Sequence, residues 1–192
     1  MSHGLPMPPF AGSCTALVTP FKNGAVDADN LCKLVDFQID NGTAALVPVG
    51  TTGESPTLSH EEHDLVVELC IKQAAGRVPV IAGAGSNSTA EAVRLAQHAA
   101  AAGASGVLIV SPYYNKPTQA GLYAHFAAVA EAVDVPVIVY DIPGRSIVQV
   151  NDNTLANLAS DYANISGIKD ATADLARPTI LHNMLGNTFT QL

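Results

Sequence analysis

Six short runs rich in Val, Ile and Leu recur along this 192-residue chain at intervals of 27 to 35 residues. Each run is nearly continuous in apolar character, which is typical of strands covered on both faces. Patterns of helical period separate the runs, so that each predicted strand is followed by a helix. This alternation predicts a parallel sheet built from right-handed βα units. The runs are "TALVTPF" (15–21), "AALVPVG" (44–50), "PVIAGAG" (79–85), "GVLIVSPYY" (106–114), "PVIVYDIP" (136–143) and "SGIKDAT" (166–172).

The predicted helices have recognisable ends. Ser59 and Glu62 fit a capping box, in which each side chain accepts a hydrogen bond from the other residue's backbone N–H. Glycines that follow the last apolar position of a helical pattern are typical stops. The predicted starts are Asp27, Ser59, Ser88 or Thr89, Thr118, and Asn151 or Asn153, and the predicted stops are Gly42 and Gly103.

Two architectures fit such alternation: a closed (β/α)₈ barrel and an open, doubly wound sheet. A barrel needs eight units and about 250 residues, whereas six units are complete here and a seventh strand, "FTQL" (189–192), begins at the end. Length therefore favours the open sheet. Polar residues at the ends of many strands favour the barrel, since an open sheet gathers ligand groups at one switch point. We predict an α/β protein with the TIM (β/α)₈ barrel fold, in which residues 1–192 form a single domain that is incomplete at the C-terminus.

Composition excludes several function classes. A net charge of −8 and the absence of a Lys/Arg run argue against a nucleic-acid partner. No apolar stretch is long enough to span a membrane, and the first ten residues lack the pattern of a secretory signal. The three cysteines are widely spaced, with no CxxC, and are predicted to be reduced core thiols. We expect a cytoplasmic protein with neither a nucleic-acid nor a membrane partner.

Polar motifs stand at the ends of the predicted strands. In "GTTGE" (50–54), two threonine hydroxyls and exposed N–H groups could hold a carboxylate or a phosphate, although an ordinary βα turn also fits. "SPYYNKP" (111–117) closes a strand with two tyrosines. "YDIPGR" (140–145) adds a third tyrosine and Arg145, which is shaped to clamp a carboxylate or to pair with Asp141 at the surface.

Two other motifs are weak. "GAGSNST" (83–89) resembles half of a dinucleotide fingerprint, but serine stands in place of its third glycine. "HEEH" (60–63) has no further His or Cys pattern to complete a zinc site, so its residues are predicted to be solvated at a helix start. His98 and His125 are predicted to be half-exposed packing residues on helices. We expect no metal and no cofactor.

Lys169 lies inside the apolar run "ISGIKDAT" (165–172), and lysine is rarely buried without a partner. A surface pair with Asp170 is one interpretation, but adjacent strand residues point to opposite faces. The other interpretation is a nucleophile, because a neutral amine attacks carbonyl groups to form a Schiff base. Such chemistry needs a proton shuttle, and tyrosine hydroxyls linked through a threonine hydroxyl could provide one.

Taken in order, "GTTGE", "SPYYNKP", "YDIPGR" and "GIKDAT" resemble the dihydrodipicolinate synthase family. This family is a branch of the pyruvate-dependent class I aldolases, which also include N-acetylneuraminate lyase. The resemblance begins at "TALVTPF" and covers the rest of the chain. It implies a lyase that condenses pyruvate with L-aspartate-4-semialdehyde through a Schiff base, giving 4-hydroxy-tetrahydrodipicolinate in lysine biosynthesis by the diaminopimelate route.

The resemblance also implies a role for each strand-end group. Lys169 corresponds to the lysine that captures pyruvate, and Tyr140 to the general acid/base. In family members the counterpart of Tyr114 reaches in from the neighbouring subunit, which implies a homodimer or homotetramer. The remaining roles are Thr51 as the hydroxyl link between the two tyrosines, Gly50 and Thr52 at the pyruvate carboxylate, and Arg145 at the carboxylate of the aldehyde substrate.

Some family members are inhibited by L-lysine at the dimer interface, and this chain carries matching residues. Glu91 is the most informative of them, because a carboxylate there can meet the amine of lysine. The predicted lysine-inhibitor site consists of Ser55, His60, His63, Gly85, Asn87, Glu91 and Tyr113.

Two departures from the family pattern leave alternatives open. Asp141 stands where members often have Asn, and we expect the added charge to be tolerated. The chain also ends before the eighth strand, which would leave two strand edges unpaired. The alternatives are a related aldolase that cleaves a sugar acid, resembling N-acetylneuraminate lyase, and a truncated barrel without activity. The second threonine of "GTTGE" and Arg145 favour the synthase.

Overall fold

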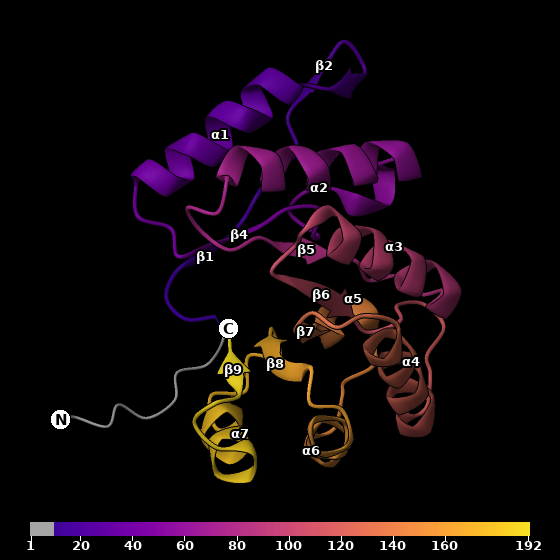
Figure 1. Ribbon diagram of the computed structural model, residues 1–192. Helices are drawn as coiled ribbons and strands as arrows, with labels where there is room; N and C mark the ends of the chain where they lie inside the picture. The colour runs from indigo at the N-terminus through magenta and orange to yellow at the C-terminus, as the bar shows by residue number, and fades with distance from the viewer. Residues whose placement is uncertain (1–9) are drawn as a thin grey trace, which may run out of the picture.

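The structure, a computed structural model, describes residues 10–192, in which strands and helices alternate (Figure 1). The strands are short, and most are buried on both faces, as the apolar runs predict. The parallel strands are β1 (Cys14–Ala16), β4 (Ala45–Val47), β5 (Ile81–Gly83), β6 (Gly106–Val110), β7 (Val137–Asp141), β8 (Ile165–Asp170) and β9 (Thr190–Gln191).

The parallel strands follow one another in sequence order. β1 pairs with β4, and β5 to β9 form a second ladder in which each strand pairs with the next. A parallel bridge between Leu46 and Val80 connects the two ladders. The strands curve into an arc with the helices on its outer side (Figure 1). This order has no switch point, so the doubly wound alternative is wrong and the fold is part of a (β/α)₈ barrel.

The helices begin where their capping residues predict. The Asp27 side chain accepts a hydrogen bond from Asn30 N at 3.1 Å, and the capping box of Ser59 and Glu62 is formed. Gly103 ends its helix in a left-handed conformation, with φ 99°, which glycine adopts without strain. The helices are α1 (Ala28–Asp40), α2 (His60–Ala74), α3 (Thr89–Ala102), α4 (Gln119–Ala132), α5 (Pro143–Ser146), α6 (Asp152–Asp161) and α7 (Arg177–Leu185), with a 3₁₀ turn at Ser55–Thr57.

Two features depart from the sequence prediction. The first strand ends at Ala16 instead of continuing to residue 21. The chain then forms a small antiparallel hairpin, β2 (Phe21–Lys22) and β3 (Ala25–Val26), before α1. Pro20 and the exposed turn at Gly24 account for the shorter first strand, because proline and glycine interrupt a continuous ladder. A hairpin therefore separates the first strand from its helix.

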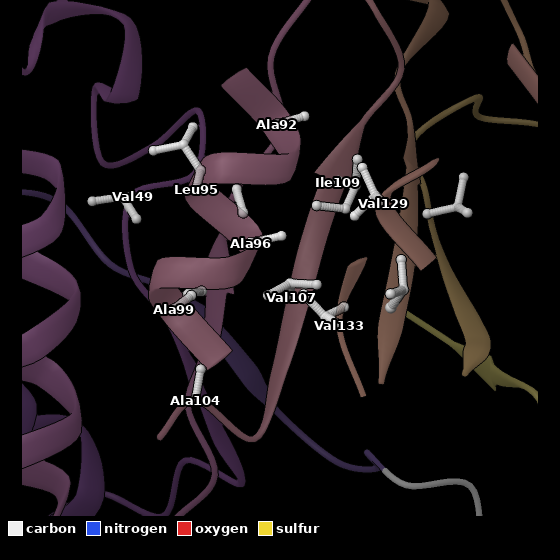
Figure 2. Close-up of a cluster of buried hydrophobic side chains, with 14 of the residues drawn as sticks. Val49, Ala92, Leu95, Ala96, Ala99, Ala104, Val107, Ile109, Val129 and Val133 are labelled. Carbon is white, nitrogen blue, oxygen red and sulfur yellow. The ribbon is translucent and has the colours of Figure 1, made fainter. Parts of the chain in front are cut away.

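Side chains alternate between two apolar layers. Val137 and Val139 belong to the layer between strands and helices, whereas Ile138 and Tyr140 belong to the layer inside the arc. Figure 2 shows the outer layer where Ala96 and Ala99 of α3 face Val107 of β6. The small alanines let α3 pack closely on the sheet. This alternation directs Tyr140 toward the interior of the barrel.

The histidine and cysteine predictions hold only in part. His98 is half-buried, but His125 is buried, with 3% of its surface exposed. Cys70 is buried, and burial raises the pKa of its thiol to about 12. Cys14 and Cys32 are only half-buried, and all three thiols are free. The prediction of half-exposure was wrong for His125 because α3 and α6 pack on both sides of its helix.

His125 gives a testable dependence of stability on pH. Its Nδ1 lies 2.9 Å from Thr89 Oγ1, and burial lowers its pKa from 6.5 to about 4. The unfolded chain binds a proton at this histidine more tightly than the folded chain does. The contribution of His125 to the free energy of unfolding is therefore lost as pH falls from about 6.5 toward 4. We expect a loss of about 2 kcal/mol in unfolding free energy between pH 7 and pH 5. Urea unfolding of the wild type and of His125→Gln at both pH values measures it, and equal losses in the two proteins would contradict the prediction.

Candidate active site

Lys169 and Tyr140 lie side by side at the ends of two neighbouring strands. They are register partners on β8 and β7, and Lys169 Nζ lies 4.2 Å from the centroid of the Tyr140 ring. Within residues 10–192, no carboxylate lies within salt-bridge distance of Lys169. The surface pair between Lys169 and Asp170 is therefore wrong. Lys169 is half-buried rather than enclosed, because it sits at the open end of the barrel.

The loop after β4 presents two threonines at the same end of the barrel. Thr19 Oγ1 donates a hydrogen bond to Gly53 O at 2.7 Å, which ties the loop to the end of β1. Gly53 is packed closely, since a Cβ there would meet the Leu17 carbonyl oxygen at 3.0 Å. Thr51 and Thr52 are exposed, and their side chains make no hydrogen bond to any described residue. The loop is thus held in place while its hydroxyls stay available to a ligand.

A cavity of about 410 Å³ opens next to the Tyr140 side chain. It brings together Gly50 and Thr51 from the loop after β4 with Tyr140 and Arg145 from the end of β7. It also extends along the predicted lysine-inhibitor residues, with the exception of Asn87. Thr52, Tyr114 and Lys169 do not line this cavity. Those predicted residues that line it are Gly50, Thr51, Ser55, His60, His63, Gly85, Glu91, Tyr113, Tyr140 and Arg145.

The predicted hydroxyl relay is not closed within this chain. Tyr114 is 84% exposed and has a left-handed backbone, with φ 71°, so that its side chain points away from the cavity. In the described part of the chain, no hydrogen bond joins the hydroxyl groups of Tyr140, Thr51 and Tyr114. Arg145 is exposed and carries no ion pair there, so the alternative of a surface pair with Asp141 is wrong.

Among the lysine-inhibitor residues, His60 of α2 and Glu91 of α3 form a polar cluster with Ser86 of the loop after β5. His60 Nε2 lies 2.7 Å from Glu91 Oε1, and the Ser86 hydroxyl donates to the other Glu91 oxygen. The Ser86 bond, and then the His60 bond, lower the pKa of the Glu91 carboxyl. His63 is buried and donates from Nε2 to the Gly83 carbonyl at 3.0 Å. The prediction that "HEEH" is solvated was therefore wrong for His63, whose buried side chain has a backbone partner.

Asn87 lies at the edge of this cluster. Its carbonyl accepts a hydrogen bond from Asn115 Nδ2 at 2.7 Å, which links the loop after β5 to the loop after β6. The Asn87 side chain also lies 3.5 Å from the Asn115 side chain. Asn87 therefore helps to hold the two loops together, and it does not line the cavity.

Sequence reasoning missed Arg177, the first residue of α7, of which 1% is exposed. It forms ion pairs with Asp141 at 2.6 Å and with Asp152 at 2.8 Å. Burial raises the pKa of the Asp141 carboxyl, and the Arg177 guanidinium opposes that shift. The charge that Asp141 adds at this position is paired with Arg177, and Asp141 does not line the cavity. The available signal was the acidic residue in place of Asn, because a buried carboxylate requires a cation.

The parallel strands form an arc of a (β/α)₈ barrel, and a lysine lies beside a tyrosine at its open end. These features define the class as (β/α)₈-barrel proteins that carry a lysine in the site. The chain belongs to the Dihydrodipicolinate synthetase family, whose sequence model matches residues 9–192. The resemblance seen in the strand-end motifs is thereby confirmed.

Individual relatives agree with the family. The chain is 59% identical over 185 residues to the 4-hydroxy-tetrahydrodipicolinate synthase of Rhodopseudomonas palustris (strain BisA53), covering 96% of this chain and 62% of that relative. The crystal structure of dihydrodipicolinate synthase from Aquifex aeolicus matches with a TM-score of 0.94 and 51% identity, covering 95% and 62%. The enzyme from Cyanidioschyzon merolae, crystallised with lysine bound, matches with a TM-score of 0.93 and 39% identity, covering 96% and 63%. The chain thus spans about 62% of the length of the relatives that it matches.

The solved relatives are TIM barrels, which confirms the predicted fold class. The apolar segments of the chain are core elements of that barrel. Among residues 10–192, no helix combines the length and the hydropathy needed to cross a membrane.

Proposed function

We propose that the protein condenses pyruvate with L-aspartate-4-semialdehyde through a Schiff base on Lys169, giving 4-hydroxy-tetrahydrodipicolinate on the route to lysine. The observation that carries the proposal is the Lys169 amine, which lies 4.2 Å from the ring centroid of the buried Tyr140 and has no carboxylate within salt-bridge distance among the described residues. The names of the relatives, at 54 to 60% identity, point to the same reaction.

The proposed chemistry uses the Lys169 amine as the nucleophile and Tyr140 beside it as the group that transfers protons. Lys169 Nζ attacks the ketone carbon of pyruvate, and the carbinolamine loses water to form an iminium ion. Loss of a methyl proton gives an enamine, whose carbon forms the new bond to the aldehyde. We assign the proton transfers at these steps to Tyr140, the tyrosine whose ring lies against the amine.

The other strand-end groups hold the substrates in this proposal. Thr52 and Gly50 bind the pyruvate carboxylate, and Arg145 binds the carboxylate of the aldehyde. Thr51 connects Tyr140 to Tyr114 of a second subunit, which agrees with the exposure of Tyr114 in the single chain. We therefore propose a cytoplasmic homodimer or homotetramer, in which residues 1–192 belong to one barrel domain.

Trapping with borohydride tests this proposal. Incubation with pyruvate and borohydride is expected to leave one reduced pyruvyl adduct per chain, mapped by peptide mass spectrometry to Lys169. Absence of an adduct from the folded protein rules the proposal out. Turnover with aspartate semialdehyde, compared with sugar-derived aldehydes, separates the synthase from a sugar-acid aldolase.

L-lysine as an effector is supported by a separate observation. The relative from Cyanidioschyzon merolae was crystallised with lysine bound. In this chain, hydrogen bonds lower the pKa of the Glu91 carboxyl at the edge of the cavity. An ionised carboxylate there can receive the ammonium group of lysine.

We expect Glu91→Gln to weaken L-lysine binding by about 10-fold or more, since it removes the charge but keeps the shape of the side chain. Isothermal titration calorimetry measures the affinity. Glu131→Gln is the matched control, because Glu131 lies on α4 outside the cavity and bonds to Tyr162. An unchanged affinity in Glu91→Gln would show that Glu91 is not a ligand, and no heat with the wild type would exclude the effector site.

A further inference from the structure

Arg177 joins three segments of the chain from a fully buried position. Its Nη1 donates to Asp141 Oδ2 at 2.6 Å, at the end of β7. Its Nε donates to Asp152 Oδ1 at 2.8 Å, at the start of α6. Its Nη2 donates to the Val150 carbonyl in the intervening loop. Each bond uses a different nitrogen of the guanidinium, whose donors are spread over a rigid plane, whereas a lysine has all its donors on one nitrogen.

The guanidinium also approaches the neighbouring strand. Asp170 Oδ2 lies 3.5 Å from Arg177 Nη1, and Asp170 is the register partner of Asp141. One cation thus faces the carboxylates that end two adjacent strands. In addition, Ala171 N donates to the Asp141 carbonyl at 2.9 Å, which continues the pairing of the two strands past their last residues.

The residues held in this way directly follow the reacting pair. Asp141 follows Tyr140, and Asp170 follows Lys169. Arg177 makes no hydrogen bond to the side chain of Lys169 or Tyr140. Its influence on them therefore passes through the backbone of β7 and β8, where a shift at one residue moves its neighbour.

We propose that Arg177 is a positioning residue that fixes the relative placement of Lys169 and Tyr140 by holding the ends of β8 and β7 together. The inference rests on the proposed Schiff-base function. It also explains the acidic residue at position 141, since a carboxylate makes a stronger bond to a guanidinium than an amide oxygen does. Small errors in placement are costly in catalysis, because a displacement of about 1 Å between reacting groups slows a reaction by up to about 100-fold.

The test compares the rate and the final extent of adduct formation. Arg177→Lys keeps the charge, but one ammonium group cannot reach acceptors in three directions. We expect the maximum trapping rate to fall by about 10-fold, while the final extent stays at one adduct per chain. The pyruvate concentration for half-maximal rate should not change, because Arg177 does not touch the threonine loop. Arg77→Lys, which alters an exposed pair with Asp36, is the matched control and should trap at the wild-type rate.

A purely structural role gives a different result. If Arg177 only stabilises the fold, Arg177→Lys lowers the final extent of adduct formation, because fewer molecules are folded. The trapping rate of the folded molecules then stays unchanged. That result overturns the inference, as does a changed half-maximal concentration with an unchanged maximum rate.

A second variant keeps the inference testable if Arg177→Lys does not fold by circular dichroism. Asp152→Asn weakens the outer, partly exposed end of the network, and we expect roughly 3-fold slower trapping with full final extent. An unchanged rate in Asp152→Asn then overturns the inference. If the wild type forms no adduct, the proposed function itself fails. If the wild type traps pyruvate and the variants match it, only the role of Arg177 fails.

Discussion

Replacing Lys169 by alanine is expected to abolish the borohydride-stable pyruvate adduct and to lower turnover by at least about 1,000-fold. The expected loss is large because removal of a covalent nucleophile leaves only binding and charge stabilisation behind. The fold should survive, since Lys169 is half-buried and makes no ion pair with any described residue. Mass spectrometry after borohydride treatment and a steady-state assay measure the two effects.

Two further variants sharpen this experiment. Lys169→Arg places a guanidinium near the Tyr140 ring but cannot form a Schiff base, so it should be as inactive as Lys169→Ala. Lys72→Ala removes an exposed lysine of α2 and should trap pyruvate like the wild type. An adduct at wild-type level in Lys169→Ala would show that another amine captures pyruvate, and would refute the assigned role.

Gly83→Ala is expected to lower the free energy of unfolding by about 3 kcal/mol. A Cβ at Gly83 would press into the Val49 carbonyl group and lie 3.0 Å from Gly50 N, so the backbone that follows β4 would have to move. Val49 already has a left-handed φ of 47°, which leaves it little freedom to adjust. Urea unfolding followed by circular dichroism measures the loss.

The displacement should also reach the cavity. Gly50 and Thr51 follow Val49 directly, so we expect Gly83→Ala to weaken pyruvate capture as well as stability. Gly144→Ala is the matched control, because a Cβ there meets nothing within 4 Å and the backbone φ is not left-handed. If Gly83→Ala unfolded at the same urea concentration as Gly144→Ala, the close contact between Gly83 and Val49 would not matter for stability.

Most of the fold could be predicted from local patterns. The capping residues Asp27 and Ser59 mark helix starts because a helix terminus needs acceptors for its free N–H groups within a few residues of sequence. Apolar runs such as 136–143 mark buried strands for an equally local reason. The first strand was too long in the prediction, because a short antiparallel hairpin leaves little apolar signal.

The candidate site was predictable only in its outline. The strand-end position of Lys169 and its neighbour Tyr140 follow from two motifs 29 residues apart whose strands pair in register. The buried partner of His63 and the ion pairs of Arg177 were not foreseen. Both depend on a side chain meeting an acceptor far away in sequence, as in the 36-residue separation of Arg177 and Asp141. The acidic residue at position 141 indicates that a cation is needed, but no local pattern shows which residue supplies it.

The sequence by itself determined the alternation of strands and helices, the helix starts and the polar groups at the strand ends. These follow from backbone hydrogen bonding and burial over a few neighbouring residues. Only the tertiary structure decided between a barrel and an open sheet, since both share the same local elements and differ in the order in which strands pair. It alone placed the Arg177 guanidinium among Asp141, Asp152 and Asp170, because a buried cation requires carboxylates that the curvature of the sheet brings together.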